Sequence, residues 1–255
     1  MLIEPYNLKQ LLKMSQSKLY EGKAKILYTT EDPDVLLTVY KDDATAFNAQ
    51  KKGQIVGKGA INCQITAALY KWLESQSIST HYIDSPEPNQ MRVKAVTIVP
   101  VEVVVRNVAA GSLCRQTGLP EGKVLDDVLV EYYYKSDELG DPLLTRDRIF
   151  LLNLVAPQRL DEIEKTARKI NQHLQSFFDK CDITLVDFKI EFGIDRQQNL
   201  LLADEISPDT CRLWDKNETD NRTKVLDKDR FRKDLGRVES AYQQVQQRVL
   251  AQLKK

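Results

Sequence analysis

Three charged residues recur at every second position in the apolar segment LVDFKIEFG, residues 185–193. Side chains alternate between the two faces of a strand, so Asp187, Lys189 and Glu191 are expected on one face and the apolar residues between them on the other. A solvated outer face is one interpretation, because charged faces usually contact water. An active site laid along a strand is the second interpretation. This segment alone leaves both open.

A second apolar run, NLLLADEI, follows after the turn residues DRQQ and predicts a β-hairpin. The hairpin would bring Glu191 close to Asp204 and Glu205. Carboxylates at close quarters are costly unless a cation or a proton lies between them, and a magnesium ion that also binds substrate phosphates would meet that need. An ordinary cross-strand salt bridge from Asp204 or Glu205 to Lys189 is the alternative.

The segment YEGKAK places Lys23 and Lys25 on one face of the expected first strand, after Gly22. The two ammonium groups could neutralise nucleotide phosphates, while the glycine would allow a close backbone approach. Lysines that protect a solvated sheet edge are the alternative. The nearby GQIVGKGA fails the P-loop pattern in spacing and in its last residue, so it is interpreted as a helix N-terminus.

An apolar strand, VVVRNVAAGSL, carries Arg106 into a small-residue loop that contains Ser112. A guanidinium, a hydroxyl and loop amides together suit an anionic group such as a sugar phosphate. An arginine bonded to backbone carbonyls in a tight turn is the alternative. Further polar residues occur in two turn segments, Lys135 and Asp141 in KSDELGDPLL, and Asp209 and Arg212 in SPDTCRLWD.

The elements that must position these residues form an α+β pattern. Two strands are expected within residues 18–30 and 34–43, and extended chain within residues 91–112. Apolar stripes at helical spacing predict helices over residues 58–78, 157–181 and 229–253. We place an N-terminal arm at residues 1–17, a strand-rich lobe at 18–98 and a mixed lobe at 99–255.

Composition narrows the function classes. The 255 residues include 37 basic and 37 acidic side chains, so the charge balance does not favour a nucleic-acid-binding protein. The sequence contains no apolar run of membrane-spanning length and no signal peptide pattern at its start, so we expect no membrane association and a cytoplasmic location. Scattered cysteines and only two histidines argue against a zinc or disulfide framework and favour carboxylate ligands, hence magnesium or manganese. These residues are Cys63, Cys114, Cys181, Cys211, His81 and His173.

Taken together, the ordered motifs resemble the phosphoribosylaminoimidazole-succinocarboxamide synthases, or SAICAR synthetases. The resemblance runs from KLYEGKAKILY through VPVEVVVRNVAAGSL, KSDELGDP, LVDFKIEFG and LADEISPDTCRLWDK to LDKDRFR, and so covers nearly the whole chain from Lys18. It implies a two-lobed α+β fold related to ATP-grasp enzymes. The implied reaction joins L-aspartate to carboxyaminoimidazole ribotide (CAIR) while ATP is cleaved to ADP and phosphate.

The resemblance also implies roles for particular residues. Lys23 and Lys25 would bind the ATP phosphates, and the adenine would lie near Ile98. Glu191 and Asp204 would bind Mg²⁺, beside the polar pair Asp187 and Lys189 at the reacting groups. The ribotide phosphate would be bound by Arg106, Ser112 and Arg212, with Lys135, Asp141 and Asp209 as further substrate contacts. Val108 replaces a basic residue that some members carry, so that position adds nothing to anion binding.

Two other functions remain as alternatives. A small-molecule kinase of similar shape would use the same lysines and carboxylates but transfer phosphate to a hydroxyl group. A nucleotide-sensing module would bind ATP without aspartate-dependent turnover. The sequence is compatible with a homo-oligomer but does not specify an oligomeric state.

Overall fold

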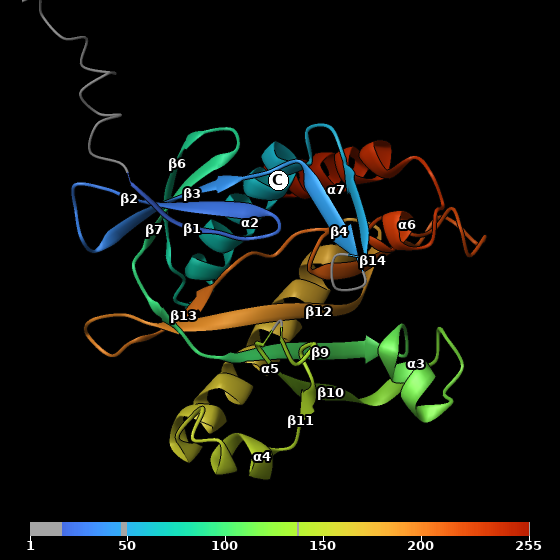
Figure 1. Ribbon diagram of the computed structural model, residues 1–255. Coiled ribbons are helices and arrows are strands. Elements are labelled where there is room, and N and C mark those ends of the chain that lie inside the picture. The colour runs from blue at the N-terminus through green and yellow to red at the C-terminus, as the bar shows by residue number, and fades with distance from the viewer. Residues whose placement is uncertain (1–16, 47–49, 137, 255) are drawn as a thin grey trace, which may run out of the picture.

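The computed structural model describes residues 17–46, 50–136 and 138–254, and the residues before 17 that we assigned to an N-terminal arm lie outside them. Two large antiparallel sheets lie one above the other in Figure 1. The upper sheet has the strand order β1-β2-β3-β7-β6. Its strands are β1 (Lys18–Glu21), β2 (Lys25–Thr29), β3 (Val35–Tyr40), β6 (Tyr82–Glu87) and β7 (Gln90–Lys94).

The helix α2 (Lys58–Ser75) packs against the upper sheet, where it contacts β3, β6 and β7. It confirms the helix predicted from the apolar stripe, and it begins directly after Gly57, whose φ of 77° is in the left-handed region that favours glycine. The segment GQIVGKGA therefore leads into a helix N-terminus, as predicted, and is not a P-loop. A separate hairpin of β4 (Asp43–Ala46) and β5 (Lys51–Gln54) precedes α2.

The lower sheet has the order β11-β10-β9-β12-β13, and β8 and β14 also pair with β12. Its strands are β8 (Thr97–Ile98), β9 (Val101–Val108), β10 (Val124–Tyr134), β11 (Leu143–Leu144), β12 (Ile183–Ile194), β13 (Leu200–Ala203) and β14 (Cys211–Asp215). The short helices α3 (Ser112–Thr117) and α4 (Arg146–Leu151) connect strands of this sheet. The long α5 (Pro157–Asp179) crosses behind β9 and β12 in Figure 1 and contacts both.

The strand β12 contains the alternating segment and organises the lower sheet. The hairpin predicted around DRQQ is confirmed, since β13 pairs antiparallel with β12 and Glu191 lies opposite Ala203. On the other edge, β9 places Arg106 opposite Asp187. The apolar face of β12 is buried, as its alternation predicts. Phe188, Ile190 and Phe192 belong to the main hydrophobic cluster, which includes residues of α5, and Val186 belongs to a smaller cluster with Val108.

Two expected elements are divided in the structure. The first expected strand is two antiparallel strands, because the Gly22 N–H donates to the Lys25 carbonyl (2.8 Å) and closes a turn that contains Lys23. Lys23 and Lys25 therefore do not share one strand face.

The expected final helix is divided into α6 (Asp229–Arg232) and α7 (Val238–Gln252). Asp234, Gly236 and Arg237 have φ values of 51°, 69° and 52°, which no α-helix accommodates. The Arg230 guanidinium holds this turn by donating from Nε to the Gly236 carbonyl (2.7 Å).

The mixed helix and strand content confirms the predicted α+β class. The expected division at residue 98 stays a prediction. Several contacts cross it: Ile98 pairs with Gly193 of β12, and α7 packs on α2. The main hydrophobic cluster likewise includes residues of both sheets and of α2, α5 and α7.

Candidate active site

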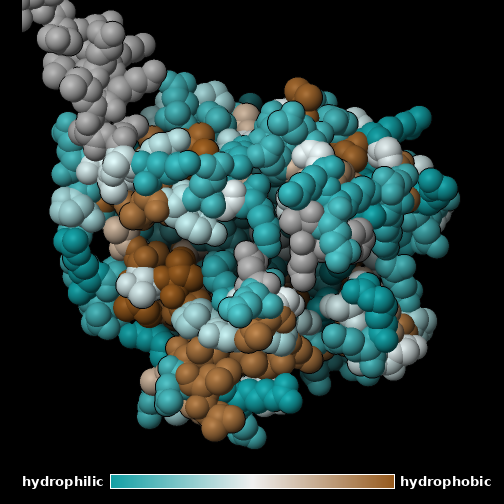
Figure 2. Space-filling model, viewed as in Figure 1, coloured by the Kyte–Doolittle hydropathy of each residue, from teal (hydrophilic) through white to brown (hydrophobic). Residues whose placement is uncertain are grey.

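A cleft of about 800 Å³ lies between the two sheets. Figure 2 shows the hollow on this face, bordered mostly by hydrophilic residues and with apolar residues gathered toward one end. Nine of the thirteen site residues predicted from sequence line it. They are Lys23, Lys25, Ile98, Lys135, Asp141, Lys189, Glu191, Asp204 and Asp209.

The floor of the cleft is a cluster of ion pairs around Lys189. Its Nζ lies 2.6 Å from Glu191 Oε1, 2.9 Å from Asp204 Oδ2 and 3.5 Å from Glu102 Oε1. The cross-strand salt bridge to Lys189 therefore exists, but it lies inside a cleft rather than on a solvated face. The charged face of β12 is mostly buried, since only 3% of Asp187 and 4% of Glu191 is exposed.

Two more lysines complete this floor. Lys25 Nζ pairs with Asp204 and lies 3.0 Å from Glu205 Oε1, and Lys135 Nζ lies 2.7 Å from Glu191 Oε1. These ion pairs join four carboxylates (Glu102, Glu191, Asp204, Glu205) to three ammonium groups. The floor therefore carries one negative charge in excess.

The pKa shifts agree with this distribution of charge. Burial opposes ionisation of Asp204, but the ammonium groups of Lys189 and Lys25 outweigh it and hold the pKa of that carboxyl well below its usual range. Burial, together with the nearby Glu191, instead raises the pKa of Glu102 against the opposing effect of Lys189. Asp204 also has a φ of 64°, a left-handed conformation that aspartate tolerates better than most residues.

The apolar end of the cleft is formed by Leu27, Leu36, Val93, Val96 and Ile98. Gly193 of β12 allows Val96 to pack there, because a Cβ at this glycine would lie 2.3 Å from Val96 Cγ2. These side chains make an apolar slot at one end of an otherwise charged cleft.

His81 borders the same slot and was not predicted as a site residue. Its Nε2 is buried without a hydrogen-bond partner among the described residues. Burial, with the nearby Lys25 charge, lowers the pKa of His81 to about 3, so the imidazole is neutral at pH 7.

A second polar cluster adjoins the cleft where Arg106, Ser112 and Arg212, which the resemblance grouped, meet Asp187. Arg106 donates from Nη1 to Asp187 Oδ2 (2.8 Å) and from Nη2 to Ser112 Oγ (2.9 Å). Arg212 donates from Nη1 to the same Asp187 oxygen (2.8 Å). Gly111 is required beside them, because a Cβ there would lie 2.4 Å from Arg212 Nη2.

Each nitrogen of the Arg106 guanidinium is hydrogen-bonded within the protein, since Nε donates to Glu131 Oε2 (2.7 Å). Its side chain therefore holds Ser112 and Asp187 in place, and its role toward a ligand stays a prediction. Sequence reasoning missed Glu131, which lies on the unassigned strand β10, and Asp229, which accepts from Arg212 Nε (3.1 Å). Val108 is buried in a small apolar cluster, in agreement with its lack of a polar role.

The remaining predicted residues also have defined partners. Asp209 is held by Lys58 Nζ (2.7 Å) and by the hydroxyl of Tyr242 (2.6 Å), which come from α2 and α7. Asp141 accepts from the Ser136 N–H (3.0 Å) at the cleft rim. Lys58 lies 151 residues from Asp209 in the chain, so no local pattern indicated this buried pair.

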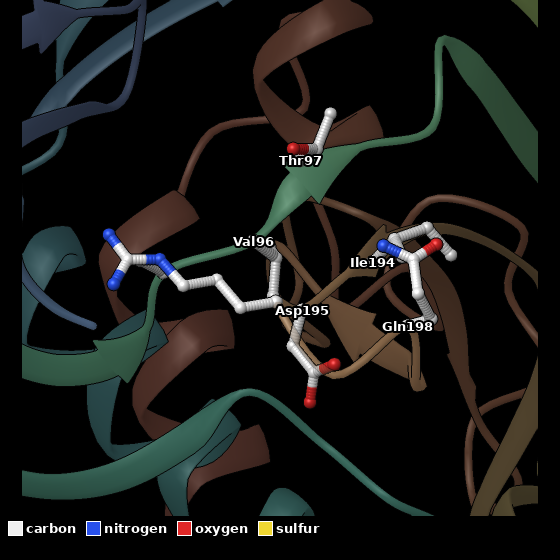
Figure 3. Close-up of a pocket in the computed structure, with 7 residues that line it drawn as sticks. Val96, Thr97, Ile194, Asp195 and Gln198 are labelled. Atoms are coloured by element: carbon white, nitrogen blue, oxygen red, sulfur yellow. The ribbon is translucent and has the colours of Figure 1, made fainter.

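A smaller open pocket of about 690 Å³ lies by β8 and the β12–β13 turn. In Figure 3 the side chain of Thr97 and the carboxylate of Asp195 point away from one another, so its polar groups do not converge. Its Arg196 is paired with Asp34 at 2.7 Å. The larger cleft is therefore the candidate active site.

Comparison with known proteins agrees with this geometry. A family model described as SAICAR synthetase matches residues 18–249. The chain belongs to the SAICAR synthetase family. A phosphoribosylaminoimidazole-succinocarboxamide synthase from Synechocystis sp. is 67% identical over 241 residues, which are 94% of this chain and 91% of that protein. The counterpart from Nostoc punctiforme is 67% identical over 92% of this chain and 96% of its own.

Solved structures of SAICAR synthetases have the same fold. The enzyme from Ehrlichia chaffeensis superposes with a TM-score of 0.88 at 42% identity, covering 92% of this chain and 99% of that one. A SAICAR synthetase in complex with ADP gives a TM-score of 0.87 at 44% identity, covering 91% and 97%. Among the described residues, no helix has the length and apolar character needed to cross a membrane.

Proposed function

We infer that this chain is an ATP-dependent ligase that joins L-aspartate to CAIR and forms SAICAR, ADP and phosphate in purine biosynthesis. Membership of the SAICAR synthetase family supports this function. The observation that carries it is the buried floor of lysines and carboxylates between the sheets, next to an apolar slot and an arginine cluster. These three surfaces correspond to the phosphates, the base and the ribotide.

The reaction needs an activated carboxylate. In the mechanism we propose, the ribotide carboxylate attacks the terminal phosphorus of ATP, and the bond to the ADP oxygen breaks. The aspartate amine then attacks the carbonyl carbon of the acyl phosphate, the amide bond forms, and phosphate leaves with the electron pair of the broken C–O bond. The amine proton passes to solvent or phosphate. Positioning and cationic stabilisation are expected to supply most of the rate.

Lys23 and Lys25 would bind the ATP phosphates, and the base would occupy the slot near Ile98. Lys189 would act as a fixed cation beside the transferred phosphoryl group. Burial favours its neutral amine, but the carboxylates of Asp204 and Glu191 outweigh this and raise the pKa of Lys189 well above its ordinary value. Lys189 is therefore assigned electrostatic stabilisation and not proton abstraction.

Magnesium fits the residues of the floor. Hard carboxylate oxygens are the ligands that Mg²⁺ prefers, and the floor holds one more carboxylate than its lysines neutralise. Glu191 and Asp204 would bind the ion, which would supply positive charge to the phosphate oxygens when present. Within the described residues no group of three or more His, Cys, Asp or Glu side chains is arranged as a complete metal site, so substrate oxygens and water would complete the ligand set.

Arg106, Arg212 and Ser112 would bind the ribotide phosphate. Asp187, which accepts from both arginines, would lie with Lys189 beside the reacting groups. Lys135, Asp141 and Asp209 would make further substrate contacts. We also propose a cytoplasmic location and a division into lobes at residues 18–98 and 99–255. We propose small molecules as the partners of this chain, and a homo-oligomer is compatible with this.

An assay of phosphate release tests the function. The purified protein should release phosphate from ATP only when aspartate and CAIR are both present, with one SAICAR formed per ADP. Equal phosphate release without aspartate would contradict the ligase assignment and favour a kinase or ATPase. ATP binding without turnover would favour a sensing module.

A further inference from the structure

One end of the cleft carries two cations that the assigned ligands do not use. Lys228 and Arg232 line the cleft beside Asp209 and Thr210. Lys228 precedes α6, and its backbone N–H donates to the Pro208 carbonyl (3.0 Å), which holds it beside the Asp209 loop. Arg232 ends α6. The backbone of both residues is therefore held by hydrogen bonds, Lys228 to the Asp209 loop and Arg232 within α6.

Lys228 has only a distant counter-charge among the described residues. Its Nζ lies 3.9 Å from Asp209 Oδ2, whereas Lys58 Nζ lies 2.7 Å from that same oxygen. The other oxygen of Asp209 accepts from Tyr242. Asp209 is thus one carboxylate between two lysines, with both oxygens already bonded. Burial, with the nearby Arg232 and Lys58 charges, lowers the pKa of Lys228, as expected for an ammonium group short of anions.

Arg232 is in a similar position. It donates from Nη1 to Asp229 Oδ1 (2.7 Å), and Asp229 also pairs with Arg212. Asp229 is thus one carboxylate shared by two arginines and, at 3.6 Å, by Lys233, and the structure gives Arg232 Nε and Nη2 no partner among the described residues. Asp227 nearby is fully buried, and burial together with the Asp229 charge raises its pKa to about 7, so it is only partly ionised at neutral pH. This end of the cleft carries a positive excess.

We propose that Lys228 and Arg232 form a binding subsite for a carboxylate of the amino-acid substrate. This inference rests on the proposed function. The ATP phosphates are assigned to Lys23 and Lys25, and the ribotide phosphate to Arg212 and Ser112. The ribotide carboxylate must reach ATP above the floor at Lys189. The aspartate carboxylates are the anions left, and a half-buried ammonium with a guanidinium fork is a suitable partner for one of them.

Two charge-removing variants test the subsite, Lys228→Met and Arg232→Gln. Each should raise the KM for aspartate by roughly tenfold or more, since each removes a charge-assisted hydrogen bond. The KM values for CAIR and ATP should change by less than about threefold, because other groups bind those anions. Succinate, a dicarboxylate without the amine, serves as a non-reactive probe, and its inhibition constant against aspartate should rise by the same factor.

Lys216→Met is the matched control. This lysine is 36% exposed on its side chain and pairs with Asp179 outside the cleft, so its aspartate KM should stay at the wild-type value. Thermal melting establishes that each variant is folded. If Lys228→Met does not fold, the more exposed Arg232→Gln decides by itself.

Three results would overturn the subsite. An unchanged aspartate KM and succinate inhibition constant in folded variants would remove it, and a KM defect confined to CAIR or to ATP would assign the two cations to that ligand. If the wild-type protein shows no aspartate-dependent phosphate release, the proposed function fails and the subsite fails with it. Normal wild-type turnover with unaffected variants removes the subsite alone.

Discussion

Lys189 and Asp204 are joined across the β12–β13 hairpin by a hydrogen bond of 2.9 Å from Nζ to Oδ2. Asp204 also pairs with Lys25 from the upper sheet. One carboxylate therefore contacts a lysine from each sheet, beside the carboxylates of Glu191 and Glu205.

Removal of either floor carboxylate should weaken the response to magnesium. Glu191→Gln and Asp204→Asn should each increase the Mg²⁺ concentration needed for half-maximal activity and lower kcat, since a neutral amide is a poorer ligand for a hard cation. The measurement is a magnesium titration of SAICAR formation. Asp84→Asn, which changes an exposed carboxylate paired with Arg92, should behave as wild type. Normal magnesium dependence in both floor variants would make Glu191 and Asp204 structural.

Arg212→Lys should weaken binding of the ribotide by about 1–2 kcal/mol, the scale of one charge-assisted hydrogen bond. The guanidinium contacts Asp187 and Asp229 at fixed angles and can meet two phosphate oxygens, whereas an ammonium group acts as a point charge. The KM for each substrate should be measured in the folded variant. Arg248→Lys serves as the control. The Arg248 guanidinium donates two hydrogen bonds to the carboxylate of Asp215 outside the cleft, so this variant should leave the ribotide KM unchanged. A defect confined to ATP would show that Arg212 serves a different ligand.

The buried His81 should make stability depend on pH. Its pKa in the folded protein is about 3, below its ordinary value of 6.5, so the unfolded chain binds more protons between these values. Stability is then fully present above about pH 6.5 and falls as the pH is lowered toward 3, by about 1.4 kcal/mol per pH unit. Urea unfolding at pH 8, 6 and 5 should show this loss in the wild type beyond that of His81→Gln.

The comparison with His81→Gln removes the contribution of the carboxylates, which titrate in both proteins. His173→Gln, which changes a histidine against Trp72 outside the cleft, controls for the loss of one histidine. Equal slopes in wild type and His81→Gln would mean that His81 is protonated in the folded protein at mildly acid pH.

Cys211 is expected to be dispensable for chemistry although it lies one residue from Arg212. Its thiol is buried, and burial raises its pKa well above the ordinary value, so it holds little of the nucleophilic thiolate. Cys211→Ser should keep substantial kcat, with some loss through packing, and so should Cys114→Ser. Steady-state kinetics of each variant, after thermal melting has established that it is folded, would check this. A folded Cys211→Ser protein that binds ATP without any turnover would refute it.

Strong periodicity made part of the site predictable. Alternation over residues 185–193 and a turn of four polar residues were enough to place Glu191 near Asp204. Apolar stripes likewise located α2 and α5. These are patterns within one element or between neighbouring elements, which a sequence displays directly.

Contacts between distant segments were not predictable in this way. Two aspartates interrupt the apolar pattern of β10, so neither that strand nor its Glu131 was identified. Lys58 appeared as an ordinary lysine at a helix start, because its partner Asp209 is defined only by the fold. The final helix was predicted too long, since the stripe continues through a turn that left-handed residues and Arg230 maintain.

The hydroxyl of Tyr242 on α7 reaches back to Asp209, which precedes it by 33 residues, and α7 also packs on α2 of the upper sheet. During synthesis on the ribosome, β12, β13 and the Asp209 loop emerge before α7 does. The Asp209 loop therefore lacks its hydrogen bond to the Tyr242 hydroxyl until the residues around 242 have been synthesised. The cleft is therefore completed only late in the synthesis of the chain, even if the strands of the lower sheet pair earlier.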